Sequence, residues 1–135
     1  MAFHLYDINE IYSNADGTIQ FIELITTSNG QNVLNGHTLR VTSGNQTNTF
    51  TFSSNLPSSA TANTTVLIAT QGFANLGIVT PDYIMPSGFL FTGGGTLNFG
   101  EGSDTLIYTA LPDDGVSSVN GSGATVTNSP KNFAG

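Results

Sequence analysis

Hydrophobic residues along this chain recur at every second position rather than at the wider intervals of a helix. Leu39 and Val41 alternate with polar residues, and Phe50 and Phe52 do the same in the following segment. Alternation of this kind is typical of β-strands that bury one face and expose the other. No segment shows the pattern of a helix of several turns, so the sequence predicts an all-β protein.

Short strands separated by turns are expected along most of the chain. They form three hairpins, and the first turns at residues 14–17, where Asp-Gly supplies the backbone conformation of a tight turn. A short helical turn is expected over residues 71–77. Pro81 and Pro86 bracket an extended segment that should not lie in the middle of a sheet. Regularly spaced short strands predict a β-sandwich. The expected strands are residues 3–12, 18–26, 37–42, 47–52, 64–70, 96–99 and 104–110.

The first two strands depart from regular alternation. The spacing slips after Leu5, which predicts a β-bulge or a twist near Asp7. In the second strand the apolar residues are too dense to alternate, which is typical of a strand that is buried on both faces. Those residues are Phe21, Ile22, Leu24 and Ile25.

The C-terminal segment differs in composition from the rest of the chain. From Leu111 onward it is rich in Gly, Ser and Asn, and residues 129–133 are expected to form a tail that docks through Phe133. The length suits one domain with one hydrophobic core. We therefore expect a single domain over residues 1–135, with its core in about residues 3–110.

The composition supports a folded β-domain. Of the 135 residues, 38% are hydrophobic and only 8% are charged, against about a quarter charged in ordinary domains. Disordered chains combine high charge with low hydrophobicity, so this chain is not of that class. Thr, Ser, Asn and Gly carry the polar share, and they suit strand surfaces and turns.

The charge balance excludes several classes of partner. The net charge is −7, and Arg40 and Lys131 are the only Lys and Arg residues. Binding to nucleic acid needs several cations against the phosphates, so it is excluded, and anionic membrane surfaces are disfavoured. No apolar run is long enough to cross a bilayer, so no membrane insertion is expected. The absence of cysteine excludes disulfides and thiolate metal sites. Cations, sugars and protein surfaces remain open as partners.

The compartment is indicated by composition alone. An acidic, Lys-poor chain rich in Thr, Asn and Gly is common among exported bacterial proteins. The residues after Met1 lack the basic start and the apolar run of a signal peptide. The protein is therefore either cytoplasmic or has lost its signal peptide ahead of Met1. We favour the second interpretation, an extracellular or cell-surface protein.

Six short motifs follow one another along the chain. They read INEIY (8–12), FIEL (21–24), LNGHTL (34–39), VLIA (66–69), GTLNF (95–99) and DTLIY (104–108). Their order resembles that of lamin-tail domains, although His37 stands where the family usually has Trp. The resemblance implies an immunoglobulin-like β-sandwich of about seven to nine short strands with no long helix. It also implies similarity to secreted or surface-anchored bacterial modules beside hydrolase or nuclease domains, although a fold does not supply a function.

The first hairpin contains a partial match to a calcium-binding loop. Counted from Tyr12, Asn14, Asp16 and Glu23 fall at three ligand positions of an EF-hand loop. Tyr12 occupies the first ligand position, where Asp is needed, and the flanking segments are strand-like rather than helical. We therefore expect a plain hairpin turn and no cofactor. A looser calcium site around Asp16 stays open.

Three carboxylates could face one another across the same hairpin. Asp7, Glu10 and Glu23 would then form a cluster suited to acid–base hydrolysis. The alternative, which we favour, is that Glu10 and Glu23 accept backbone hydrogen bonds or face solvent. His4 and His37 are too few for a zinc site, and His37 is expected to be a core or half-buried residue. No catalytic residue is therefore assigned.

The tyrosines offer a further alternative. Exposed Tyr rings could stack on sugars, but packing in the core or at its rim is favoured over such a platform. The sequence thus predicts a non-catalytic extracellular module for protein interaction, attachment or assembly, with self-association through strand edges as a corollary. The alternatives are a glycan-binding accessory module and a small carboxylate-based hydrolase. The tyrosines are Tyr6, Tyr12, Tyr83 and Tyr108.

Overall fold

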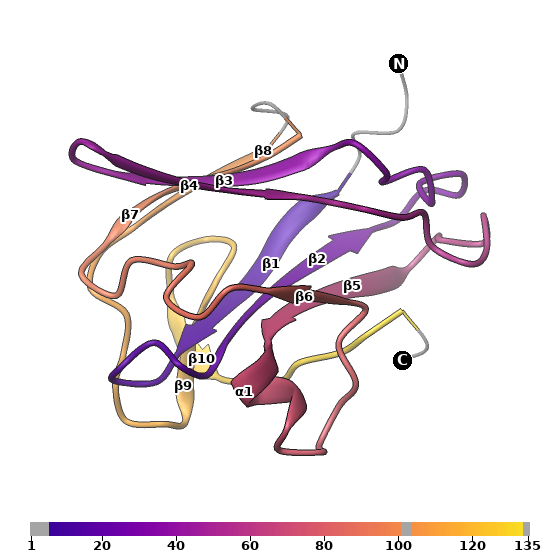
Figure 1. Cartoon of the computed structure of the whole chain (residues 1–135). Coiled ribbons are helices and arrows are strands. Elements are labelled where there is room, and N and C mark those ends of the chain that lie inside the picture. Colours follow the sequence, from indigo (N-terminus) through magenta and orange to yellow (C-terminus); the bar gives the residue numbers. More distant parts are fainter. Residues whose placement is uncertain (1–5, 101–103, 134–135) are drawn as a thin grey trace.

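The computed structural model describes residues 6–100 and 104–133 and consists of two β-sheets packed face to face (Figure 1). A six-stranded sheet has the order β10-β9-β1-β2-β5-β6, and a four-stranded sheet has the order β4-β3-β7-β8. The predicted all-β sandwich is confirmed, and the described residues form ten strands, slightly more than the seven to nine expected, with one helix of four residues. The elements are β1 Asp7–Ser13, β2 Gln20–Thr26, β3 Thr38–Ser43, β4 Gln46–Thr51, β5 Thr64–Thr70, α1 Gln71–Ala74, β6 Tyr83–Met85, β7 Gly95–Phe99, β8 Asp104–Tyr108, β9 Ser117–Asn120 and β10 Thr125–Thr127.

The three predicted hairpins are present as the antiparallel pairs β1/β2, β3/β4 and β7/β8. Gly17, in the turn of the first hairpin, has a φ of 77°, a value that residues with a side chain rarely adopt. The proline-bracketed segment forms β6, which pairs in parallel with β5 at the edge of its sheet. Its exclusion from the middle of a sheet is therefore confirmed.

The predicted bulge in the first strand is confirmed. The register between β1 and β2 shifts between Ile8 and Glu10. Gly121 closes against this irregularity, where its amide donates to the carbonyl oxygen of Asn9 at 2.9 Å. A Cβ atom at position 121 would lie 2.3 Å from the carbonyl oxygen of Ile8, so only glycine fits.

The strands β9 and β10 were not among those expected from the sequence. They form a hairpin, and β9 pairs with β1 through Glu10–Asn120 and Ile11–Val119. The alternation signal is weak here because Val119 is the one buried hydrophobic residue in these two strands. Tertiary pairing with β1, rather than local hydrophobicity, places this segment in the sheet.

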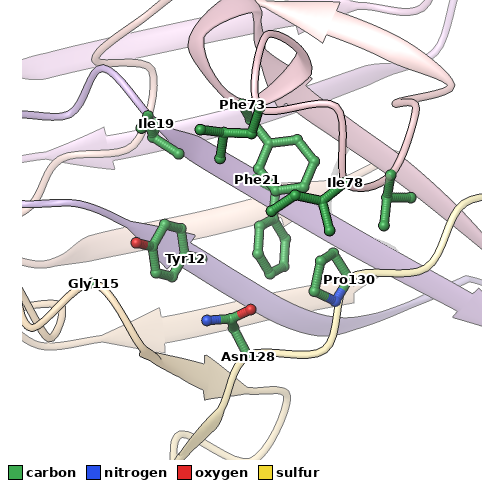
Figure 2. Close-up of a pocket in the computed structure, with 10 residues that line it drawn as sticks. Tyr12, Ile19, Phe21, Phe73, Ile78, Gly115, Asn128 and Pro130 are labelled. Atoms are coloured by element: carbon green, nitrogen blue, oxygen red, sulfur yellow. The ribbon is translucent and has the colours of Figure 1, made fainter.

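The strand β2 is buried on both faces, as the density of its apolar residues predicted. Every residue of β2 is buried except Ile25, which is half-buried. Phe21 belongs to a cluster on the outer face, away from the second sheet (Figure 2). This cluster is covered by α1 and by an extended C-terminal segment, residues 128–133, which we call the strap. The cluster consists of Tyr12, Phe21, Leu67, Ala69 and Phe73.

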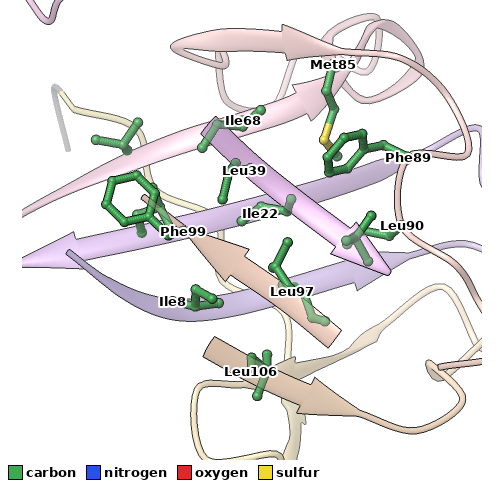
Figure 3. Packing of buried hydrophobic residues seen from close by; sticks show 14 of the residues in the cluster. Ile8, Ile22, Leu39, Ile68, Met85, Phe89, Leu90, Leu97, Phe99 and Leu106 are labelled. Carbon is green, nitrogen blue, oxygen red and sulfur yellow. The ribbon is translucent and has the colours of Figure 1, made fainter. Parts of the chain in front are cut away.

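The main core lies between the two sheets (Figure 3). Ile22 and Ile68 contribute from the six-stranded sheet, and Leu39, Leu97 and Phe99 contribute from the four-stranded sheet. Residues after position 110 also belong to it, since Leu111 and Val119 are buried and Phe133 packs against it. The predicted docking of the tail through Phe133 is thus confirmed. The helical turn expected after β5 is α1, which is too short to span a membrane, and it is the sole helix in the described ranges.

Candidate functional site

The strap crosses the outer face of the six-stranded sheet and is held there by carboxylates. The amide of Ser129 donates to Glu10 at 2.9 Å, and the amide of Lys131 donates to Glu23 at 2.6 Å. Two residues further on, the amide of Phe133 donates to Asp82 at 2.9 Å. In an extended chain the amides of alternate residues point the same way. Three carboxylates therefore hold the strap by its main-chain amides at alternate residues.

The two glutamates lie opposite each other in the β1/β2 register and are almost fully buried. Glu10 also accepts hydrogen bonds from the hydroxyl of Ser118 and, within the strap, from the hydroxyl of Ser129. Glu23 also accepts one from the Asn9 side-chain amide at 2.7 Å. These contacts support the structural alternative over acid–base catalysis. Asp7 is exposed and takes part in none of them.

Burial changes the acidity of these carboxylates. It raises the pKa of Glu23 and of Asp82, and the amide donors from the strap oppose this effect only in part. The neighbouring Glu10 carboxylate adds to the rise at Glu23. The folded protein therefore binds protons at these sites more readily than the unfolded chain does, which links folding to pH.

We expect the free energy of unfolding to rise as the pH is lowered from 7 towards about 4. A raised pKa contributes stability that is complete below the unfolded value and is lost as the pH climbs through the folded value. Asp16 and Asp114 act in the opposite direction below their ordinary value of 3.8, because hydrogen bonds lower their pKa in the folded state. Urea unfolding measured across this range checks the prediction. Glu23→Gln should make the free energy of unfolding depend less steeply on pH. A pH dependence equal to that of the wild type would show that Glu23 does not contribute to it.

Of the partial calcium motif, Asn14 and Asp16 lie together in the turn, but Glu23 is not brought to them. Asp16 accepts hydrogen bonds from the amide and the hydroxyl of Thr18, and Asn14 accepts one from the amide of Ile19, which closes the turn. Glu23 lies on the outer face of β2 and is bound to the strap. No group of three or more His, Cys, Asp or Glu side chains that could hold a metal occurs within residues 6–100 and 104–133. His4 lies outside these ranges, and His37 is half-buried.

All four tyrosines are buried, with exposed fractions of 1% to 7%, so they form no exposed platform for sugars. Three hydroxyls donate to main-chain carbonyl oxygens at 2.8 to 3.0 Å. The hydroxyl of Tyr12 has no hydrogen-bond partner among the described residues. The three donors and their acceptors are Tyr6 to Gln31, Tyr83 to Ser54 and Tyr108 to Phe91.

The tyrosines should therefore respond differently to loss of the hydroxyl. Replacing Tyr108 with phenylalanine is expected to lower the free energy of unfolding by about 1 kcal/mol, because a buried carbonyl loses its donor. Tyr6→Phe and Tyr83→Phe should lower the free energy of unfolding by a similar amount. For Tyr12→Phe the free energy of unfolding should stay within about 0.5 kcal/mol of the wild-type value. Urea titrations of the four variants check this. A loss at Tyr12 as large as at the others would mean that its hydroxyl is bonded in the folded protein.

An apolar cavity of about 500 Å³ opens on the outer face beside the strap (Figure 2). We call it the outer pocket. Tyr12 and Phe21 stack with ring centroids 5.4 Å apart and an interplanar angle of 13°, and Phe73 meets Phe21 edge-on at 5.5 Å. Its volume is within the range of ligand sites. The lining residues are Tyr12, Ile19, Phe21, Phe73, Leu76, Ile78, Val79, Gly115, Asn128 and Pro130.

The outer pocket is assembled from distant parts of the chain. Thr70 caps α1 by accepting from the amide of Phe73 at 3.3 Å, and its hydroxyl donates to the carbonyl oxygen of Thr18 at 2.8 Å. These bonds fix Phe73 over β2. Asn128 and Pro130 reach the pocket from the strap, where they point towards Tyr12 and Phe21 (Figure 2).

Sequence reasoning missed the outer pocket. Its one local signal is the apolar density of β2, which requires a cover on the outer face. The spacing of Phe73 and Leu76 also indicated a helical turn, but nothing in the sequence places that turn over Phe21. Comparison with known proteins adds no assignment, because no family model, no curated protein and no solved structure matches this chain.

Proposed function

We propose that this protein is a non-catalytic interaction module, extracellular and of the lamin-tail kind, that binds a partner protein by an apolar side chain in the outer pocket. The observation that carries the proposal is the rim of the pocket. Leu76 and Ile78 are 50% and 71% exposed, directly beside an aromatic floor. Exposed apolar side chains around a concave apolar site are typical of protein interaction sites, where a buried anchor residue supplies most of the affinity.

The arrangement of the carboxylates supports a binding role over hydrolysis. Glu10 and Glu23 are buried beneath the strap and accept hydrogen bonds from the chain itself. A general acid or base must reach the reacting group of a substrate. The outer pocket, by contrast, is lined by no charged side chain. Its shape suits the capture of an apolar group.

The glycan-binding alternative has less support. Stacking on sugars needs an exposed aromatic face, and the chain has no Trp while its four Tyr are buried. Titration with soluble polysaccharides, followed by tyrosine fluorescence, tests this alternative. A saturable change would favour it.

Binding of the uncharged apolar dye Nile red tests the proposed site. We expect one saturable site, and Ile78→Ser should weaken the binding about three- to tenfold because the rim loses apolar area. The side chain is exposed, so the free energy of unfolding should stay within about 0.5 kcal/mol of the wild-type value. Fluorescence titration and urea unfolding measure the two quantities.

A matched control is available on the opposite sheet. Ile107 in β8 is 76% exposed and does not line the outer pocket. Ile107→Ser removes the same apolar area and should leave dye binding unchanged. If both variants weaken binding equally, or if the dye fails to bind the wild type, the outer pocket is not the interaction site.

A further inference from the structure

We infer that the anchor group of the outer pocket is an uncharged aromatic ring that donates a hydrogen bond, as the indole of a partner's tryptophan or the phenol of a tyrosine does. This inference rests on the proposed function and specifies the ligand of the same site. Three features of the pocket carry it: its aromatic floor, its free hydrogen-bond acceptor and its charge.

The floor of the pocket favours an aromatic guest. Phe21 is already in contact with two rings, stacked on Tyr12 and edge-on to Phe73. Tyr12, Phe21 and Phe73 are only 7%, 1% and 4% exposed, so a guest ring would meet them over the small area open to the pocket. There, edge-to-face contacts add to the energy of the area that is buried. The apolar walls formed by Ile19, Val79 and Pro130 complete a site that is wide enough for a ring system.

The pocket contains a side-chain oxygen that can accept a hydrogen bond from a guest. The side-chain nitrogen of Asn128 donates to the carbonyl oxygen of Val116 at 2.6 Å, which identifies the other amide atom as the oxygen. That oxygen receives no hydrogen bond from the described part of the chain, and Figure 2 shows the side chain directed towards the pocket. The hydroxyl of Tyr12 also has no described partner, and in Figure 2 it lies on the side of the ring away from Phe21. A ring N–H or O–H entering the pocket would satisfy this acceptor.

Charge excludes an anionic guest. None of the described residues that line the pocket is Lys, Arg or His. Burial and the nearby Asp114 carboxylate both raise the pKa of Tyr12, which indicates a negative potential at that end of the site. With a net charge of −7 on the whole chain, a carboxylate or phosphate group would be repelled. A donor group that carries a negative charge is therefore disfavoured at this site.

The test compares three small ligands: N-acetyltryptophanamide, N-acetylphenylalaninamide and N-acetyltryptophan. Because the chain contains no Trp, the fluorescence of a tryptophan ligand reports binding without a tryptophan background. Displacement of Nile red gives the affinity of the phenylalanine derivative. We expect N-acetyltryptophanamide to bind about fivefold more tightly than N-acetylphenylalaninamide, the worth of one neutral hydrogen bond. The anionic N-acetyltryptophan should bind more weakly than the amide.

A double variant, Tyr12→Phe with Asn128→Ala, removes both polar atoms. The hydrogen bond from the main-chain amide of residue 128 to the carbonyl oxygen of Val116, at 3.0 Å, does not involve the side chain. The strap should therefore keep its position beside the pocket. The preference for tryptophan over phenylalanine should fall to about equal affinity while Nile red still binds. A preference that survives in this variant, or none in the wild type, overturns the inference. Nile red binding in the wild type would then leave the proposed function standing, whereas failure of every ligand would overturn both.

Discussion

Replacing Gly72 with alanine is expected to lower the free energy of unfolding by about 3 kcal/mol and to abolish dye binding at the outer pocket. A Cβ atom at this position would lie 2.3 Å from the carbonyl oxygen of Thr18 and 3.2 Å from its carbon. Both are main-chain atoms, so neither can rotate away. The start of α1 would have to move off the first hairpin.

That movement would break the contacts that build the pocket. The Thr70 hydroxyl accepts from the amide of Gln20 at 3.1 Å and donates to the carbonyl oxygen of Thr18. Phe73, which follows Gly72 in α1, would be displaced from Phe21. Urea unfolding and Nile red titration measure the two consequences.

Gly93 provides the matched control. It lies in a turn, and a Cβ atom there would meet nothing within 4 Å. Gly93→Ala should therefore leave stability within about 0.5 kcal/mol and dye binding intact. If Gly72→Ala were equally harmless, the close approach of α1 to the first hairpin would not exist in solution.

Replacing Glu23 with alanine is expected to lower the free energy of unfolding by about 2 to 3 kcal/mol and to release the strap. The amide of Lys131 and the side-chain amide of Asn9 would both lose their acceptor beneath a buried face. Hydrogen exchange should then show loss of protection at the amides of Ser129, Lys131 and Phe133. Nile red should also bind more weakly, because the strap forms one wall of the pocket.

Glu23→Gln separates the hydrogen bond from the charge. The glutamine side chain keeps an oxygen that can accept from the Lys131 amide, and burial no longer disfavours an ionised group. We expect this variant to retain the strap protection that alanine loses. Equal loss in both variants would show that the carboxylate charge, rather than its acceptor oxygen, holds the strap. Equal retention would show that Glu23 does not hold it at all.

Local sequence patterns predicted some features of this fold and not others. The strand 64–70 was predicted with the bounds of β5, because its apolar run is flanked by polar turns on one side and by a helical turn on the other. The bulge in β1 and the burial of β2 on both faces were also predicted, since each leaves a trace in the spacing of apolar residues. Each of these features depends on residues close together in the sequence.

The outer pocket and the strap could not be predicted in the same way. Glu10 and Glu23 contact residues more than a hundred positions away, with separations of 119 to Ser129 and 108 to Lys131. The bonds from Ser129 and Lys131 that hold the strap include main-chain amides, which every residue except proline carries, so these partners leave no mark in the sequence. The hairpin of β9 and β10 was missed for a related reason. Its own side chains bury little apolar surface, and hydrogen bonding to β1 places it in the sheet.

By itself, the sequence determined the all-β class and the three main hairpins, because period-two alternation and turn residues are local properties. Tertiary structure alone decided what the acidic residues of the first hairpin do. It turned Glu10 and Glu23 away from the Asp16 turn and set them under the strap. It also made the outer pocket, because a cavity requires side chains from β1, β2, α1 and the strap to meet, and that meeting is fixed by packing and not by sequence neighbours.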